Sequence, residues 1–323
     1  MPSSPAAPLV DALDFPAETL RLLTQCRDGM VAEGNIWADY FAGVVRQQIQ
    51  DRVFHGLLWS GPGEEAVALA GWEVAGTLGR RGWVYLAQGF QRRAVLEGFL
   101  TRLESPSAGS LPFLTWADEI PGVPVADRDA VFRGRGLSST VRADMRLPKG
   151  VHPPQPPPDP AFPARPLTLA DEPLIADLMF RTYRGEPERA LFATTLDERA
   201  DAVEGTRGLL HGDVGRWLPA ASFGIEADGR LVAQTQANEL AGGLITEVGV
   251  DPAYRRRGFA RRLLPLTIDA LRSAGFEAPR LVVTMWNPRA VALYQRLGFE
   301  FQPGGAGRVW LNLPLLGVLP TSP

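Results

Sequence analysis

Arginines and small residues lie between a predicted strand and a predicted helix in the C-terminal half of the chain. Residues 244–250 are rich in β-branched side chains and alternate in polarity, which predicts a strand. Leucine and isoleucine then recur at helical spacing from Leu263 until Gly275. The turn around Gly258 lets the backbone come close to a ligand, and a helix start offers N–H groups without intrahelical partners. This combination suits a phosphate or pyrophosphate; the alternative is a plain turn with a solvated arginine face.

A second strand-to-helix unit follows. Residues 281–286 predict another strand, and the helix after it has recognisable ends. Asn287 is a good N-cap, Pro288 suits the first helical position, and Gly298 suits the position after the last turn. The ordered pair of units carries more information than either unit alone.

Together, the two units resemble the GNAT superfamily of acyl-CoA-dependent N-acyltransferases. The family's Arg/Gln-x-x-Gly-x-Gly/Ala signature matches Arg255, Gly258 and Ala260. Its second signature matches the later helix, at Asn287, Ala290, Leu293, Tyr294, Leu297, Gly298 and Phe299. The resemblance covers about residues 165–313.

The resemblance implies that acetyl-CoA, as a co-substrate, lies where two parallel strands splay apart, here the strands ending near Val250 and Trp286. Backbone groups of the first strand would pair with the pantetheine arm, amides of the turn would hold the pyrophosphate, and nearby guanidinium groups would add contacts to phosphate. The implied cofactor-binding residues are Val248, Gly249, Val250, Arg255, Arg256, Arg257, Gly258, Phe259, Ala260 and Asn287.

Two residues are candidates for acid and base catalysis. Forming an amide from a thioester and an amine requires a base for the amine, a hydrogen-bond donor for the carbonyl oxygen and an acid for the thiolate. Tyr294 is the acid that the family signature implies; the alternative is a core tyrosine on an apolar helix face. Glu247 is the candidate base, because alternation points its side chain away from Val248, towards a cleft or solvent. The alternative is an exposed strand glutamate, with a water chain deprotonating the amine.

Composition restricts the other classes of function. The 323 residues are 45% hydrophobic and 21% charged, which is typical of globular proteins, and the net charge of −3 gives no basic field for nucleic acid. One cysteine, Cys26, excludes an intrachain disulfide and favours a reducing compartment. No run of 18 apolar residues and no signal-peptide pattern is present, so we expect a cytoplasmic protein without a membrane partner. No Cys/His cluster predicts a metal site, and the three histidines have no partner pattern.

A proline-rich segment divides the chain. Residues 148–164 predict a semi-rigid linker between a domain at 1–147 and a catalytic domain at 165–323. The two halves share an order of predicted elements, and laying Gly258 on Ala94 aligns them. In this overlay Leu96 replaces Ala260 and would fill the space of a pyrophosphate, and Phe132 replaces Tyr294. The first half is therefore interpreted as a degenerate copy; the alternative is an unrelated α/β domain.

The sequence thus predicts an α/β (α+β) protein of two tandem GNAT-like domains. Each domain should be a mixed, mostly antiparallel sheet flanked by helices, with two splayed parallel strands; this tandem form is similar in architecture to mycothiol synthase. The predicted activity is transfer of an acetyl group from acetyl-CoA to a primary amine by direct attack in the C-terminal domain. The acceptor would be a small-molecule or peptide amine, and the protein a monomer or homodimer. The alternative is a non-catalytic acyl-CoA sensor or scaffold whose N-terminal half binds a partner.

Overall fold

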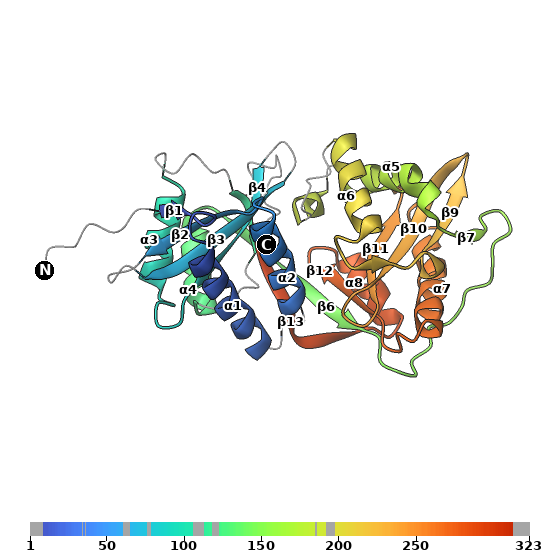
Figure 1. The fold of residues 1–323 in the computed structure, drawn as a ribbon. Coiled ribbons are helices and arrows are strands. Elements are labelled where there is room, and N and C mark those ends of the chain that lie inside the picture. The colour runs from blue at the N-terminus through green and yellow to red at the C-terminus, as the bar shows by residue number, and fades with distance from the viewer. Residues whose placement is uncertain are drawn as a thin grey trace, which may run out of the picture. The chain divides into compact units, whose positions relative to one another are not determined.

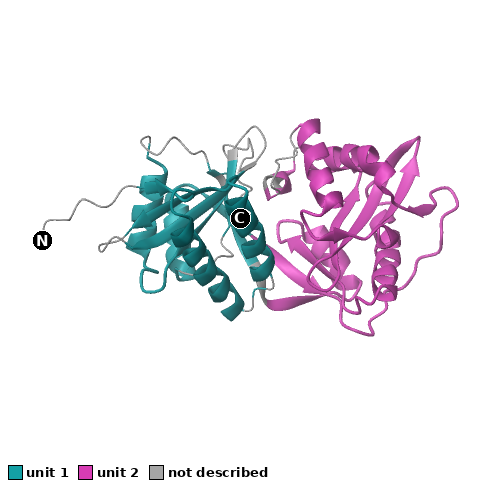
Figure 2. Cartoon of the chain, viewed as in Figure 1, with its two compact units in different colours: residues 1–140, 307–323 teal, residues 141–306 magenta. Residues whose placement is uncertain are grey.

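The computed structural model describes residues 9–33, 35, 37–60, 65–75, 79–105, 113–117, 123–184, 186–191 and 198–312. Contacts divide the chain into two compact units (Figure 2). Unit 1 comprises Met1–Thr140 together with Gly307–Pro323, and unit 2 comprises Val141–Ala306. None of the described helices is both long enough and apolar enough to span a lipid bilayer.

The N-terminal half supplies most of unit 1 (Figure 1). Its elements are β1 (Leu9–Asp11), α1 (Pro16–Ala32), α2 (Ala38–Gln50), β2 (His55–Ser60), β3 (Ala66–Ala75), β4 (Gly79–Leu86), α3 (Arg93–Leu103), β5 (Phe113–Ala117), α4 (Val125–Gly134) and β6 (Ser138–Arg146). Strands β1 to β4 pair antiparallel in chain order, and β5 then pairs parallel to β4.

The C-terminal half supplies most of unit 2. Its elements are β7 (Ala164–Pro166), α5 (Glu172–Tyr183), α6 (Arg199–His211), β8 (Arg216–Trp217), β9 (Phe223–Ala227), β10 (Arg230–Glu239), β11 (Leu244–Val250), α7 (Phe259–Ser273), β12 (Arg280–Thr284), α8 (Pro288–Arg296) and β13 (Glu300–Leu311), with short 3-10 turns η2 (Leu169–Asp171), η3 (Pro187–Leu191), η4 (Pro219–Ala221) and η5 (Pro252–Tyr254). Strands β7, β9, β10 and β11 pair antiparallel, and β12 pairs parallel to β11.

The two halves repeat the same fold. Apart from the short β8, each runs strand, two helices, three strands, helix, strand, helix, strand, and in each the third and fourth strands pair antiparallel while the fourth and fifth pair parallel. The predicted α/β fold of two similar domains with mixed, mostly antiparallel sheets is therefore confirmed.

The parallel strands of unit 2 diverge after their first residues. The ladder between β11 and β12 joins only Leu244 to Arg280 and Ile245 to Leu281. Beyond Ile245, no strand of the described residues pairs with the edge of β11 that faces β12. A β-bulge at Thr246 interrupts the pairing of β11 with β10 at the same level. Bulges occur frequently beside active sites, where they redirect side chains. The predicted splay is therefore present in unit 2.

The last strand of each half pairs within the other unit. Residues 142–146 of β6 pair antiparallel with β12 in unit 2. Residues 309–311 of β13 pair antiparallel with β5 in unit 1. The contact boundaries near residues 140 and 306 therefore differ from the predicted boundaries at 147 and 165, because the two terminal strands are exchanged.

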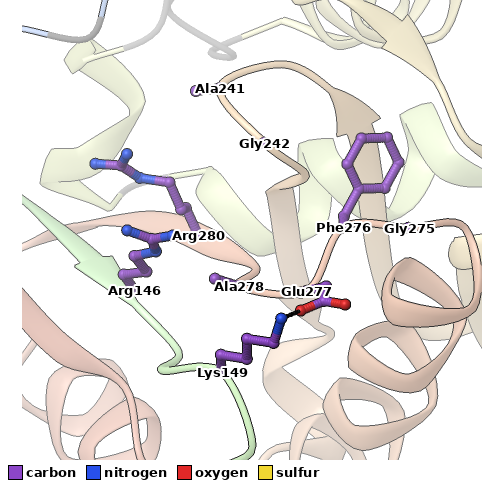
Figure 3. A pocket seen from close by; sticks show the side chains of 9 residues that line it. All are labelled: Arg146, Lys149, Ala241, Gly242, Gly275, Phe276, Glu277, Ala278 and Arg280. Atoms are coloured by element: carbon purple, nitrogen blue, oxygen red, sulfur yellow. Dashed lines mark ion pairs between the residues drawn. The ribbon is translucent and has the colours of Figure 1, made fainter.

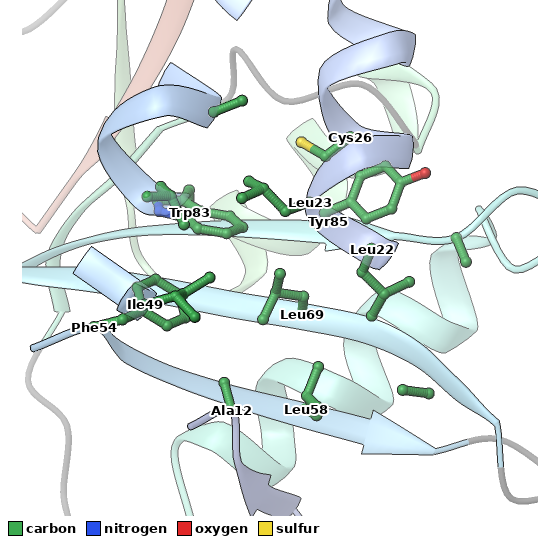
Figure 4. Packing of buried hydrophobic residues seen from close by; sticks show 14 of the residues in the cluster. Ala12, Leu22, Leu23, Cys26, Ile49, Phe54, Leu58, Leu69, Trp83 and Tyr85 are labelled. Atoms are coloured by element: carbon green, nitrogen blue, oxygen red, sulfur yellow. The ribbon is translucent and has the colours of Figure 1, made fainter. Parts of the chain in front are cut away.

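Each unit has its own apolar core. In unit 1, α1 and α2 pack over β2 to β4 through residues such as Leu22, Leu69 and Trp83 (Figure 4). Cys26 belongs to this cluster, and burial, followed by the charge of Glu33, raises the pKa of its thiol. A buried thiol that stays protonated is a core residue, not a nucleophile.

In unit 2, the two faces of the sheet carry different side chains. Thr235 of β10 faces α7, where its Oγ1 lies 2.6 Å from Oγ1 of Thr267. Gln234 and Gln236, the residues on either side of Thr235, face the other way, because successive strand residues alternate between faces. The second face is covered by α5, whose last residue contacts Glu247 of β11. This second face carries the polar residues of the candidate site.

Candidate functional site

The turn between β11 and α7 is built from unusual backbone conformations. Asp251 caps η5 by accepting a hydrogen bond from the N–H of Ala253 at 2.8 Å. Arg256 and Gly258 both have positive φ, 67° and 82°. A Cβ at Gly258 would meet no atom within 4 Å, so the space above this residue is open and the glycine is required by its conformation.

The first turn of α7 has free hydrogen-bond donors. Gly258 is the N-cap, and the first bond into the helix is donated by Arg262 to the carbonyl of Gly258 at 3.1 Å. The N–H groups of Phe259, Ala260 and Arg261 consequently have no acceptor within the described ranges. Free N–H groups beside open space at the positive end of a helix form a site for an anion.

The arginines of the turn do not all point to this site. Arg255 donates to Glu186 Oε1 at 3.0 Å and to the carbonyl of Thr182 at 3.2 Å, so it ties the turn to the end of α5. Arg257 lies over the ring of Tyr254, 4.9 Å from its centroid, and Arg256 is exposed. The structure thus gives Arg255 a different partner from the phosphate that the resemblance implied.

Asn287 and Tyr294 both belong to the second signature. The side chain of Asn287 accepts a hydrogen bond from the N–H of Ala290 at 3.1 Å, so the residue is the predicted N-cap of α8. The ring of Tyr294 is buried in the core beside Phe299, at 6.0 Å between centroids. Its hydroxyl makes no hydrogen bond to any described residue. Burial, and then the charge of Glu247, raise the pKa of Tyr294.

Glu247 is buried, with only 4% of its surface exposed. Burial raises the pKa of its carboxyl to about 7, although hydrogen bonds from Tyr183 and from the backbone of Val248 act in the opposite direction. Glu247 is therefore not the exposed strand glutamate of the alternative, because α5 covers this face of β11. A carboxyl with this pKa can exchange a proton near neutral pH.

Two glutamines of β10 lie opposite Glu247 and Gly249 of β11. Gln236 pairs with Glu247, and Gln234 pairs with Gly249, so all four share one face of the sheet. Gln236 donates to Gln234 Oε1 at 3.2 Å, whereas Gln234 Nε2 and Gln236 Oε1 are buried without a partner in the described structure. A Cβ at Gly249 would come within 3.2 Å of Glu247 Oε1, so the glycine leaves room for the carboxylate.

Tyr183 was not among the residues predicted for the site. Its hydroxyl lies 2.9 and 3.0 Å from the two carboxylate oxygens of Glu247, across 64 positions of sequence. The tyrosine ends the amphipathic pattern of α5 and belongs to no signature, so only an alignment or a structure could have identified it. Val248 and Phe259, which were expected at the cofactor, contribute side chains to the cores on the α7 side.

The equivalent region of unit 1 is filled. Leu96 is 2% exposed and packs in a core with Phe132, Trp116 and Trp310. Helix α3 already begins at Arg93, so Ala94 lies within its first turn, whereas Gly258 precedes α7. The turn of this region has a glycine with positive φ, Gly89, but it lies four residues before α3, and Phe132 has no hydroxyl. That unit 1 is a degenerate copy stays a prediction.

A separate pocket of about 360 Å³ lies at the start of β12 in unit 2 (Figure 3). Arg146, Lys149 and Arg280 line it, but Lys149 is paired with Glu277, and Arg280 with the buried Asp144. It contains none of the predicted site residues. No group of three or more metal-ligating side chains is found among the described residues.

Known proteins support the sequence resemblance. The profile of the acetyltransferase (GNAT) family matches residues 184–299. The [ribosomal protein bS18]-alanine N-acetyltransferase of Salmonella typhimurium is 33% identical over 113 residues, which are 33% of this chain and 72% of that protein. The mycothiol acetyltransferase of Thermomonospora curvata is 29% identical over 226 residues, or 68% of this chain and 70% of that protein. Other matches cover less, down to 26% of the mycothiol acetyltransferase of Beutenbergia cavernae.

A solved structure extends the likeness to the whole chain. A tandem GNAT protein from the clavulanic acid biosynthesis pathway superposes with a TM-score of 0.51 at 13% identity, covering 94% of this chain and 97% of that chain. At this identity the likeness concerns the fold alone, and it agrees with the repeat seen in the two halves. The signature turn, the splayed strands and these matches show that the chain belongs to the acetyltransferase (GNAT) family and is an acyltransferase of the tandem form.

Proposed function

We propose that the protein transfers an acetyl group from acetyl-CoA to a primary amine, and that catalysis takes place in unit 2. The observation that carries this proposal is the buried carboxyl of Glu247, at the level where β11 and β12 diverge. The pKa of this carboxyl is about 7, and its charge also raises the pKa of the Tyr294 phenol. A base and an acid in one buried place are what transfer from a thioester to an amine requires.

The residues present fit acetyl-CoA. The free N–H groups of Phe259, Ala260 and Arg261 beside the open space at Gly258 would hold the pyrophosphate, and Arg256 and Arg257 would add positive charge. The unpaired edge of β11, from Val248 to Val250, would pair with the amide groups of the pantetheine arm. Acetyl-CoA supplies the acetyl thioester. Asn287 supports this site indirectly, by fixing the start of α8.

Three proton transfers accompany the reaction. Glu247 takes a proton from the ammonium form of the acceptor, and the neutral amine nitrogen then bonds to the acetyl carbon. As the carbon–sulfur bond breaks, Tyr294 gives its proton to the thiolate that leaves, and the phenolate of Tyr294 takes back the second proton that the nitrogen loses when it becomes an amide. Its raised pKa keeps the phenol protonated near neutral pH, and its hydroxyl has no competing partner among the described residues.

The chemical class of the acceptor is proposed from the relatives and from the two glutamines opposite Glu247 and Gly249. One of the relatives is named for mycothiol and the other for an alanine of ribosomal protein bS18. A small-molecule or peptide amine is therefore the proposed class. The partnerless Gln234 Nε2 and Gln236 Oε1 offer a donor and an acceptor to polar groups next to the amine. A cytoplasmic location and a monomeric or homodimeric state stay predictions.

An acetyl-transfer assay tests the proposal. Purified protein is incubated with acetyl-CoA and a panel of primary amines, including peptides with free N-termini and amino thiols, and thiol release is measured. We expect Glu247→Gln to lose at least about 100-fold in turnover, the usual contribution of a positioned base. Glu239→Gln, an exposed glutamate at the end of β10, is the matched control and should keep wild-type turnover. Thiol release by Glu247→Gln at the wild-type rate would remove the carboxylate from the reaction.

A further inference from the structure

Tyr183 bonds to the carboxylate that the proposed mechanism uses as base. Its hydroxyl donates to Glu247 at 2.9 Å from Oε1 and 3.0 Å from Oε2, so a single proton is shared between both oxygens. Burial, followed by the charge of Glu247, raises the pKa of Tyr183 well above its ordinary value, which keeps the hydroxyl a donor. The geometry fixes the plane and direction of the carboxylate.

The end of α5 is itself held at the two residues that precede Tyr183. Arg181 pairs with Asp251 and donates to the carbonyl of Leu231 at 2.8 Å. The carbonyl of Thr182 accepts from Arg255 at 3.2 Å. Asp251 and Arg255 both belong to the segment that joins β11 to the anion site. The position of Tyr183 is therefore fixed by the same segment that would hold the pyrophosphate.

We propose that Tyr183 is a positioning residue, whose hydroxyl orients the Glu247 carboxylate and stabilises its ionised form for the acceptor amine. The inference rests on the proposed function of Glu247 as a base. Tyr183 does not touch the reacting atoms; it acts through the carboxylate. One of the two carboxylate oxygens must be released from the shared proton when an amine binds, and the hydroxyl can remain on the other.

The groups that face Glu247 allow the direction of its titration to be derived. Tyr294 approaches from α8 and Tyr183 from α5, and the neighbours on β10 are the uncharged amides of Gln234 and Gln236. The charge of Glu188 in η3 also raises the pKa of Tyr183. Arg181 and Arg255 are paired with Asp251 and Glu186. The hydroxyl of Tyr183 thus opposes the effect of burial, and its removal raises the pKa of Glu247 further.

Tyr183→Phe removes this hydroxyl and keeps the ring. The base is active when ionised, so kcat/KM falls as pH drops through the pKa of Glu247. In the variant we expect this acid limb to move up by about one to two pH units, the effect of losing a hydrogen bond to a charged group. Activity near pH 7 should therefore fall by about 5- to 50-fold, because half of the wild-type carboxyl is ionised at that pH, and should recover as pH rises above the new pKa. Acetyl-CoA affinity and the melting temperature are measured on the same protein.

Tyr254→Phe is the matched control, because it also removes a hydroxyl that donates to a carboxylate, at 3.0 Å, but this carboxylate is Asp228 and not Glu247. The ring under Arg257 is kept. The acid limb of this control should stay at the wild-type pH. The proposal would be overturned if the acid limb of Tyr183→Phe also stayed at the wild-type pH. In that case kcat/KM either falls equally at every pH or does not fall at all. The first of these outcomes would show a merely structural role.

A second measurement does not depend on turnover. The carboxyl signal of Glu247 is followed by carbon NMR of glutamate-labelled protein during a pH titration, and Glu247→Gln identifies the signal. Its midpoint should move up in Tyr183→Phe; an unmoved midpoint would contradict the inference. If the wild type acetylated no amine, the proposed function would fail, while this titration would still decide whether Tyr183 stabilises the ionised carboxylate.

Discussion

At the scale of single residues, burial prepares Glu247 and Tyr294 for opposite tasks. It brings the carboxyl to a pKa of about 7, so the group can accept a proton near neutral pH. It raises the pKa of the phenol, so that group stays protonated and can donate. Environments that separate the protonation states of two neighbouring groups are typical of acid and base pairs in enzymes.

Tyr294→Phe tests the acid. The change removes one hydroxyl without a hydrogen bond to the described residues, so the core around Phe299 should stay packed and the melting temperature should change little. Turnover should fall by about 100-fold or more, the usual contribution of a positioned acid. Acetyl-CoA affinity, measured by calorimetry, should change little, because the hydroxyl matters once charge builds on sulfur.

The control is Tyr85→Phe, which removes the hydroxyl of a buried tyrosine in unit 1. It should keep wild-type turnover. A Tyr294→Phe protein with full turnover would mean that solvent protonates the thiolate. A loss of stability without a rate defect would show that Tyr294 is only a core residue.

Glu247→Gln also has a consequence for stability. The pKa of the carboxyl is about 7 in the folded state and 4.5 as its ordinary value, so the unfolded chain releases the proton first. The protonated carboxyl makes its full contribution to the free energy of unfolding below pH 4.5, and this contribution is lost as pH rises to 7 and above. The loss amounts to about 3 kcal/mol. Glutamine cannot ionise, so urea unfolding should show the variant gaining about that amount relative to wild type between pH 4 and pH 8. A difference that does not depend on pH would contradict the raised pKa.

At the scale of elements, the local features of the site were predictable. Gly258 with positive φ at the start of α7 and Asn287 as the cap of α8 follow from residues within one turn of the chain. Backbone conformations and caps depend on neighbours in sequence, so a single sequence contains the information. The splay of β11 and β12 was implied by the family resemblance and not by any property of the strands themselves.

The partners of Glu247 and Arg255 were not predictable in the same way. Tyr183 and Glu247 are separated by 64 positions, and Arg255 and Glu186 by 69. Alternation along β11 states that Glu247 faces away from Val248, but it does not state which element covers that face. The helix α5 decides this, and its position depends on packing of the whole unit.

The turn before α7 can be tested with two isosteric variants. Gly258→Asp and Gly258→Asn share size and tolerance of positive φ, and open space surrounds the position. They differ by one negative charge beside the free N–H groups. Gly258→Asp should therefore bind acetyl-CoA at least about tenfold more weakly than Gly258→Asn. Calorimetry should also show one site per chain in the wild type. Equal affinities of the two variants would place the pyrophosphate elsewhere, and a second equivalent site would contradict a filled unit 1.

At the scale of the whole molecule, the exchange of terminal strands ties the two halves of the chain to each other's units. Met145 of β6 is fully buried in the core of unit 2, and Trp310 of β13 is fully buried in the core of unit 1. The sequence predicted strands at both places. It did not predict the neighbours of these strands, because an alternating pattern fixes the buried face and not the strand that pairs alongside.

Trp310→Ala distinguishes the exchanged arrangement from a C-terminal domain that folds by itself at 165–323. In unit 1, Trp310 pairs with Trp116 of β5, and its ring stacks on Phe132 at 5.4 Å between centroids. Truncation of a buried tryptophan costs about 3–5 kcal/mol. We therefore expect a substitution near the C-terminus to speed hydrogen exchange in α3, α4 and β5 of unit 1.

The matched variant is Phe299→Ala, only 11 positions earlier but buried in the core of unit 2 beside Tyr294. It should speed exchange in α7 and α8 and leave α3 and α4 close to wild type. The two substituted residues are close in sequence. If any substitution near the C-terminus loosened the protein in the same way, hydrogen exchange would become faster in the same helices in both variants. Faster exchange in α7 and α8 with protected α3 and α4 in Trp310→Ala would instead support the boundary at residue 165. Opposite patterns in the two variants would follow only if the last strand stabilises the unit formed by the first half of the chain.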